Sequence, residues 1–380
     1  MHKALPYGKQ FIDSNDINEV VRTLKKDKIT TGPLVLSFEK KIKNFLKCKF
    51  ALVCNSGTSA IYLAFKAIKV KKGDIIIMPT VNFISSYNVS KSFGAKIYLA
   101  DVDKFTGQIS PKSVEDCCKK FKLKKVKAII LMYNGGYPYF SDQFLKLKKK
   151  YNCKIIEDAC HAFGAEYKSK NNKFKIGSCK HSDVCTFSFH PVKTITTGEG
   201  GAISTNSREL YDKMRLFRSH GIERKKNQHW KYNINNSGLN FRLTDFQCAL
   251  GISQLSKVNK FLTKRKKIAL IYRKKLKELK QIEIINHNAN YISSNHLFLM
   301  HIKNFSLEKK NKFIKYMLKN KIVLQYHYIP IYKFKVYRGN HIKKNSETYY
   351  KNTVSLPIYY SLSANDQNYI VKKIKSFFNK

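Results

Sequence analysis

The 380-residue sequence has no apolar run that approaches the ~18 residues needed for a membrane-spanning helix. Its first ten residues, MHKALPYGKQ, lack the apolar stretch that follows the charged start of a secretory signal. We therefore expect a cytoplasmic protein with no membrane partner. The nine cysteines form no C-x-x-C pair, and their number is odd. This pattern favours buried, reduced thiols over a disulfide framework or a metal site.

Acidic residues and arginine are scarce. The chain has 25 Asp and Glu residues and 73 Lys and Arg residues, so its net charge is +48. Only nine of the 73 basic residues are Arg. One interpretation is a polyanion-binding protein, such as a basic, non-catalytic nucleic-acid-binding regulator. The other is a lysine-covered surface. Because the lysines are spread along the whole chain, we favour the second interpretation and expect no nucleic-acid partner. The positive field still favours acidic small molecules.

The apolar fraction of 43%, with 25 Phe and 23 Tyr, is typical of a globular protein. The spacing predicts a helix over residues 17–26, with Ile17, Val20, Val21 and Leu24 on one face and Ser14 as its cap, and a helix over about 36–46. Short apolar runs then alternate with helical patterns at 60–68 and 143–150. The predicted strands are residues 50–54, 75–78, 97–100, 128–132, 154–156, 184–189 and 202–204. This alternation predicts an α/β fold with a mostly parallel sheet covered on both faces.

From about residue 207 the pattern is mainly helical, over 243–255 and 262–279. A smaller α+β unit follows, with strands at 296–302 and 322–328 and helices at 307–319 and 364–378. We predict a large α/β domain with an N-terminal arm over residues 1–255. Residues 256–380 would form a linking helix and a small C-terminal α+β domain.

Four segments carry possible chemistry, each beside a strand end, where ligands of open α/β sheets bind. Residues 55–60 (NSGTSA) open a helix and suit a phosphate, although an ordinary capped turn has the same pattern. Residues 155–164 end a strand with Glu157 and Asp158. A carboxylate there can pair with a buried cationic ring nitrogen, or Asp158 can simply cap the next helix.

The strongest segment is residues 186–201, TFSFHPVKTITTGEGG, in which Lys193 has small or apolar neighbours. A desolvated lysine has a lowered pKa and can form an imine, and Ser188 can flank a phosphate. Residues 238–251 open another helix, and Asn240 and Arg242 precede it as possible anion contacts.

In their order along the chain, these segments resemble the DegT/DnrJ/EryC1/StrS sugar aminotransferases, which belong to the fold type I pyridoxal-phosphate enzymes. The resemblance implies pyridoxal 5'-phosphate as cofactor, with Lys193 as the lysine that binds it covalently. Asp158 would keep the ring nitrogen protonated. The resemblance also implies that Gly57, Thr58 and Ser188 hold the phosphate, that Phe83 stacks on the ring, and that His161 bonds its hydroxyl. Asn240 would reach the phosphate of the neighbouring protomer in a homodimer with shared active sites.

Within the family, segments 28–33, 218–222, 294–298 and 325–332 resemble the branch that acts in pseudaminic acid biosynthesis. That branch implies transfer of an amino group from glutamate to the C4 ketone of a UDP-linked 4-keto-6-deoxy sugar. The candidate substrate contacts are Tyr7, Lys28, Ile29, Thr30, Gln325, His327 and Tyr328. The turn at residues 132–138 (MYNGGYP) departs from the family pattern, which leaves a perosamine-type or legionaminic-type 4-ketosugar as an alternative. Sugar 3-dehydratases of the same scaffold carry His in place of the lysine, so Lys193 favours transamination.

Overall fold

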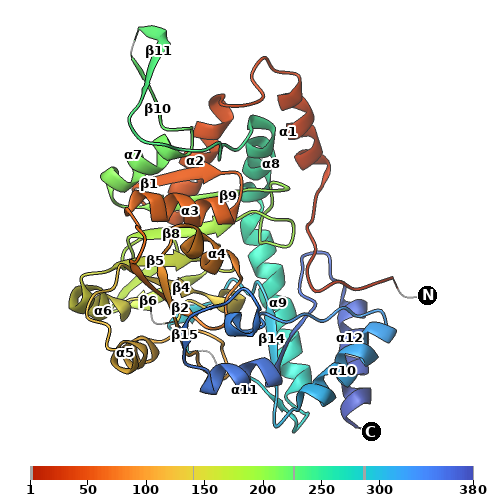
Figure 1. Cartoon of the computed structure of the whole chain (residues 1–380). Coiled ribbons are helices and arrows are strands. Elements are labelled where there is room, and N and C mark those ends of the chain that lie inside the picture. The colour runs from red at the N-terminus through yellow and green to blue at the C-terminus, as the bar shows by residue number, and fades with distance from the viewer. Residues whose placement is uncertain (1–2, 140, 226, 286–287, 380) are drawn as a thin grey trace.

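The computed structural model describes residues 3–139, 141–225, 227–285 and 288–379. An eight-stranded sheet lies at its centre, with helices on both faces (Figure 1). Strand β9 is antiparallel to both its neighbours, and the other neighbouring pairs are parallel. The predicted α/β class is therefore confirmed. In sheet order, the strands are β1 (Phe50–Cys54), β9 (Gly201–Thr205), β8 (Val184–Ser188), β5 (Lys154–Asp158), β4 (Ala128–Met132), β2 (Ile75–Pro79), β3 (Lys96–Ala100) and β15 (Asn340–His341).

Alternating side chains of the strands pack against helices on opposite faces. In β1, Leu52 and Cys54 pack in one cluster with residues of α3 and α7, whereas Ala51 and Val53 pack in another with α2 and α8. Burial on both faces explains why these strands are almost wholly apolar. The helices are α1 (Ser14–Leu24), α2 (Pro33–Leu46), α3 (Gly57–Ala67), α4 (Ser85–Ser92), α5 (Pro111–Lys120), α6 (Phe144–Tyr151), α7 (Arg208–Phe217), α8 (Asp245–Ser256), α9 (Val258–Leu276), α10 (Leu307–Lys319), α11 (Lys344–Asn352) and α12 (Ala364–Phe378).

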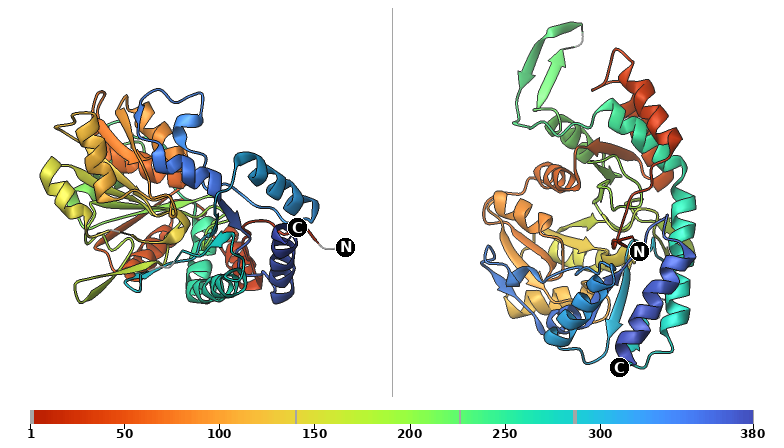
Figure 2. Two further views of the ribbon diagram at one scale, coloured as in Figure 1. Left: turned by 90° about the horizontal axis from the view of Figure 1, so that it is seen from below. Right: turned by 90° about the vertical axis from the view of Figure 1, so that its right-hand side faces the viewer.

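A third apolar cluster lies towards the C-terminus. The long helix α9 runs beside α12 (Figure 2), and α10 and α12 cover a three-stranded sheet of β12 (Ile282–Glu283), β14 (Phe298–Ile302) and β16 (Thr353–Leu356). Leu5 of the N-terminal arm joins this cluster, and β15 adds a C-terminal segment to the large sheet. The domain boundary predicted at residues 255 and 256 falls where α8 meets α9, and it stays a prediction.

Two small elements complete the fold. One is a three-stranded sheet of β13 (Tyr291–Ile292), β6 (Glu166–Ser169) and β7 (Asn172–Lys175). The other is a hairpin of β10 (Ile222–Lys225) and β11 (Gln228–Ile234), which projects from the body of the molecule (Figure 1). The sequence patterns, which suggested mainly helix after residue 207, did not predict this hairpin.

Two local predictions were wrong. Asp13, rather than Ser14, caps α1, because the carboxylates of Asp13 and Asp16 each accept the backbone N–H of the other residue. Ile17 and Leu24, on the apolar face of this helix, are 55% and 52% exposed. Residues 322–328 are not a strand; they make only isolated bridges, at Ile322 and Gln325.

Three further expectations can be compared with the structure. All nine cysteines are free, and all except Cys160 are buried, as predicted. The described residues contain no group of three or more His, Cys, Asp or Glu that could hold a metal ion. Among the helices that the structure describes, none has both the length and the apolar character to cross a membrane.

Candidate active site

A cavity of about 540 Å³ opens where several parallel strands end. Met132 ends β4, Asp158 ends β5 and Ser188 ends β8, and all three line it. The first residues of α3 and the loop that follows β2 complete this side. The carboxyl ends of parallel strands meet at one edge of a sheet, so residues far apart in sequence converge there.

Lys193 enters this cavity from the loop between β8 and β9. Burial lowers the pKa of its amine from the ordinary value. The neighbouring Cys160 and Asp158 oppose this shift, and the Arg265 guanidinium adds to it. A lowered pKa increases the fraction of neutral amine, which is the form that attacks a carbonyl carbon.

Asp158 is 2% exposed and accepts two hydrogen bonds, both from uncharged donors. The Ser86 hydroxyl donates to Oδ2 at 3.2 Å and the Cys160 N–H to Oδ1 at 3.3 Å. Within the described residues, Asp158 forms no ion pair. A buried carboxylate is stabilised by a cationic partner, so the site fits a protonated ring nitrogen.

The start of α3 provides an anion cradle. Ser56 caps the helix by accepting the Ser59 N–H at 3.0 Å, which leaves the N–H groups of Gly57 and Thr58 beside the cavity. A Cβ on Gly57 would lie 3.0 Å from the Ser188 Cβ and 3.3 Å from the Cys160 Sγ. Glycine thus lets the helix start approach β8 closely. Free N–H groups and the helix dipole favour a phosphate at this point.

The hydrogen bonds of His161 fix its tautomer. Burial holds the pKa of this imidazole well below its usual value, so it is neutral, and Lys193 acts in the same direction. The Gly135 N–H donates to Nδ1 at 3.4 Å, and Nε2 lies 2.8 Å from the Tyr328 hydroxyl. Because Nδ1 accepts, the single ring proton is on Nε2 and is donated to Tyr328. The hydroxyl hydrogen of Tyr328 is then available to an acceptor in the cavity.

Two more histidines lie beside His161. The ring centroid of His296 is 4.4 Å from that of His161, and the His327 Nδ1 is 2.8 Å from the Ser355 hydroxyl. Burial lowers the pKa of His327 to about 3 and that of His296 well below its ordinary value. These three buried histidines are therefore neutral hydrogen-bonding groups and not cations.

The structure brings most of the predicted site residues together. The cavity is lined by Tyr7, Gly57, Thr58, Phe83, Asp158, His161, Ser188, Lys193, Gln325, His327 and Tyr328. Phe83 lies at its mouth, 52% exposed, with its ring centroid 5.8 Å from that of Tyr328.

Four predicted residues do not line this cavity: Lys28, Ile29, Thr30 and Asn240. They are exposed elsewhere, near the start of α8. The Ile29 carbonyl accepts the Asp245 N–H at 2.9 Å, and the Asn240 Oδ1 accepts the Arg242 N–H at 3.3 Å.

Sequence reasoning missed three residues that line or support the cavity: Asn82, Ser86 and His296. The side-chain amide of Asn82 is buried and, within the described residues, neither its nitrogen nor its oxygen has a partner. A ligand can satisfy such a group. Asn82 directly precedes Phe83, which was predicted to line the site, and His296 lies in segment 294–298. No sequence pattern distinguished Asn82 or His296 from their neighbours.

Comparison with known proteins agrees with this geometry. The profile of the DegT/DnrJ/EryC1/StrS aminotransferase family matches residues 10–375. The UDP-4-amino-4,6-dideoxy-N-acetyl-beta-L-altrosamine transaminase of Campylobacter jejuni is 35% identical over 99% of this chain and 98% of its own. The GDP-perosamine synthase of Escherichia coli O157:H7 is 30% identical over 92% of this chain and 91% of its own.

Solved structures show the same fold. The aminotransferase PseC of Helicobacter pylori, described as involved in the biosynthesis of pseudoaminic acid, superposes with a TM-score of 0.90 at 30% identity, over 99% of this chain and 100% of its own. The putative sugar aminotransferase Spr1654 of Streptococcus pneumoniae, in its PLP form, gives a TM-score of 0.90 at 26% identity over 99% of both chains. The expected fold type I architecture is thereby confirmed.

Proposed function

The chain belongs to the DegT/DnrJ/EryC1/StrS aminotransferase family, and from this premise we propose its reaction. The protein is a pyridoxal-phosphate-dependent sugar aminotransferase. Its proposed reaction is transfer of an amino group from glutamate to the C4 ketone of a UDP-linked 4-keto-6-deoxy-N-acetylhexosamine, as in the pseudaminic acid pathway. The convergence of Lys193, Asp158 and the start of α3 on one cavity carries the proposed transamination, and the 35% identity to the altrosamine transaminase supports the proposed sugar.

The residues of the cavity fit pyridoxal phosphate. When bound, this cofactor takes up the amino group of a donor and passes it to an acceptor ketone. The N–H groups of Gly57 and Thr58, with Ser188, would hold its phosphate. Asp158 would hold the proton on the ring nitrogen, and Phe83 would cover one face of the ring.

Lys193 would have two roles. Its neutral amine would bind the cofactor covalently, and after the donor displaces it, Nζ would move a proton between carbon atoms of the reacting groups. Both roles require an amine that is largely unprotonated near neutral pH, which agrees with the direction of its pKa shift. Tyr7, Gln325, His327 and Tyr328 would contact the sugar.

We also propose that the enzyme is a homodimer. Trp230, Tyr232 and Ile234 on the projecting hairpin are each more than half exposed, and Leu36 is 67% exposed. A two-stranded hairpin is marginally stable alone, so a partner surface is expected to cover it. Asn240 and the exposed segment 28–30 would then contribute to the partner's active site. Mixing inactive Lys193→Ala and Asn240→Ala chains tests this: shared sites predict partial recovery of activity, and separate sites predict none.

Nine free cysteines, eight of them buried, suit a reducing compartment, so we propose a cytoplasmic location. A direct test of the substrate is to incubate the holoenzyme with glutamate and a panel of 4-ketosugars, and to identify the amino sugars by mass spectrometry. The proposal predicts that the UDP-linked N-acetyl-4-keto-6-deoxy sugar has the highest kcat/KM. A higher kcat/KM for the GDP-linked 4-keto-6-deoxy sugar would overturn it in favour of a perosamine-type reaction.

A further inference from the structure

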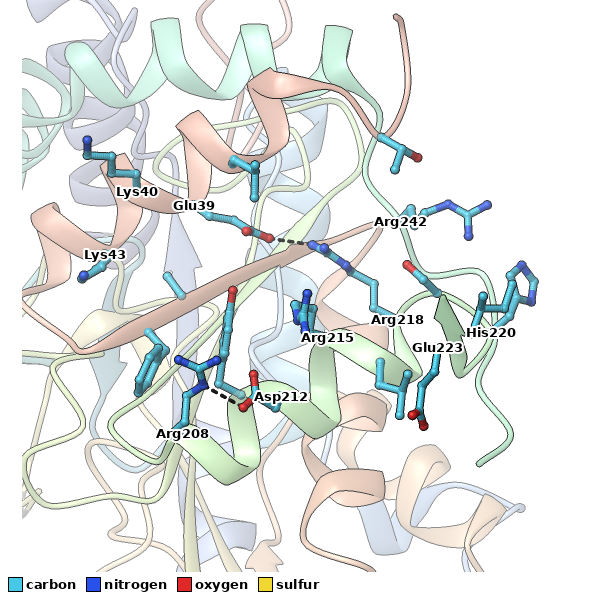
Figure 3. A pocket seen from close by; sticks show the side chains of 18 of the residues that line it. Glu39, Lys40, Lys43, Arg208, Asp212, Arg215, Arg218, His220, Glu223 and Arg242 are labelled. Carbon is cyan, nitrogen blue, oxygen red and sulfur yellow. Dashed lines mark hydrogen bonds and ion pairs between the residues drawn. The ribbon is translucent and has the colours of Figure 1, made fainter. Parts of the chain in front are cut away.

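A second and larger cavity, of about 1360 Å³, lies between α2, the start of β1 and α7 (Figure 3). Among the residues that the structure describes, none lines both cavities. We call the second cavity the arginine cleft, because it is lined by Arg208, Arg215, Arg218, Arg224 and Arg242.

The cleft holds five of the nine arginines of a chain whose basic residues are otherwise lysines. These five are spread over residues 208–242, so their convergence is not apparent from the sequence. A lysine-covered surface does not explain why arginine gathers in one cavity. The planar guanidinium binds two oxygens of a phosphate or carboxylate at once, which an ammonium does not.

The carboxylates of the cleft do not neutralise its cations. Among the described residues that line the cleft, three lysines, Lys40, Lys43 and Lys49, add to the five arginines, against three carboxylates. Glu39 pairs with Arg218 at 2.6 Å and Asp212 with Arg208 at 2.7 Å (Figure 3).

Over the residues that the structure describes, Arg215, Lys40 and Lys43 form no ion pair. The Nε of Arg218 is buried, and it too has no partner among those residues. Cations and a buried donor thus remain for a ligand.

The catalytic cavity, in contrast, has few cationic residues for binding a diphosphate. Among the described residues that line it, Lys193 is the only lysine or arginine, and its amine is needed for the cofactor. The buried histidines beside it are neutral. A nucleotide-linked sugar carries a diphosphate with about two negative charges, which calls for cations beyond those of this cavity.

We propose that the arginine cleft binds the diphosphate of a nucleoside diphosphate; this inference rests on the proposed nucleotide-sugar substrate. Phe50, at the start of β1, lines the cleft. Ser56, just beyond the end of β1, lines the catalytic cavity. An extended chain between them spans about 20 Å. The diphosphate therefore comes from a substrate seated in the partner's cavity or from a free nucleotide, and the two share the same chemistry.

The test is calorimetric titration of the holoenzyme with UDP, with inorganic pyrophosphate and with uridine. The double variant Arg215→Gln/Lys43→Gln removes two unpaired cations of the cleft. Its matched control, Lys124→Gln/Lys125→Gln, removes two charges from an exposed segment elsewhere. We expect UDP and pyrophosphate to bind, and uridine to bind much more weakly. The cleft variant should raise both dissociation constants by about tenfold or more, and the control by less than twofold.

Equal dissociation constants for the cleft variant and the control would overturn the proposal, because the general positive field would then account for binding. A raised KM for the ketosugar with an unchanged kcat would identify the substrate as the source of the diphosphate. An unchanged KM with weakened UDP binding would identify a free nucleotide. Reaction with glutamate is measured separately in each variant. If the wild type fails that reaction, the proposed function fails, whereas the UDP titration still tests the cleft.

Discussion

Tyr328→Phe removes a single hydroxyl, which lies 2.8 Å from the Nε2 of His161. His161 donates its Nε2 proton to that hydroxyl, and its Nδ1 already accepts the Gly135 N–H. The imidazole therefore cannot move its proton to the other nitrogen without losing a second hydrogen bond. The substitution leaves one buried N–H of His161 unpaired and removes the donor that Tyr328 presents to the cavity.

The size of the effect follows from this geometry. An unpaired buried donor costs about 1–3 kcal/mol, which in a chain of this length lowers the melting temperature by roughly 1–4 °C. Loss of a hydrogen bond to a charged or polarised oxygen in the cavity is expected to slow the glutamate half-reaction by about 10- to 100-fold. Rapid mixing of the holoenzyme with glutamate measures that rate, and thermal unfolding of the cofactor-free protein measures stability.

Tyr326→Phe is a matched control: Tyr326 also lines the cavity, but its hydroxyl donates to the side chain of Asn311, which does not line it. In a double-mutant cycle, His161→Gln should remove most of the effect of Tyr328→Phe, since the two side chains act as a pair. Additive effects, or a Tyr328→Phe enzyme as fast as the Tyr326→Phe control, would refute the assigned tautomer and the role of the hydroxyl.

Three further outcomes are expected. Gly57→Ala places a Cβ 3.0 Å from the Ser188 Cβ, so it should weaken pyridoxal phosphate binding at least tenfold in a fluorescence titration. Unchanged affinity would contradict a phosphate site at the start of α3. Burial lowers the pKa of His327 to about 3, so the unfolded chain takes up a proton below about pH 6.5 while the folded chain does not. His327 alone should therefore lower stability by about 1.4 kcal/mol per pH unit between roughly pH 6 and 4, and His327→Asn should reduce the measured slope by about that amount. Asp13→Ala should destabilise the protein by about 1 kcal/mol in urea unfolding and Ser14→Ala by much less, because Asp13 is the cap of α1.

Much of the fold was predictable because its signals are local. Each strand of the large sheet is a short apolar run, and helices such as α10 and α12 have an apolar repeat and a Ser cap immediately before their first residue. The Lys193 segment was recognisable because a lysine among small and apolar residues is unusual in so lysine-rich a chain.

The rest depends on contacts between distant residues. Nothing local indicates that His161 meets Tyr328, which is 167 positions away, or that five arginines converge on one cleft. The periodicity of α1 predicts an apolar face but not what covers it. Its exposure in the single chain agrees with a surface that a second copy would bury.

The central claim is that Lys193 binds pyridoxal phosphate and that glutamate then donates its amino group. The most direct measurement is the absorbance spectrum of the protein purified with pyridoxal phosphate, before and after addition of glutamate, with Lys193→Ala beside it. We expect a band at about 420 nm that shifts to about 330 nm with glutamate and is absent from the variant. A wild type without the band, or a variant that retains it, would contradict the account.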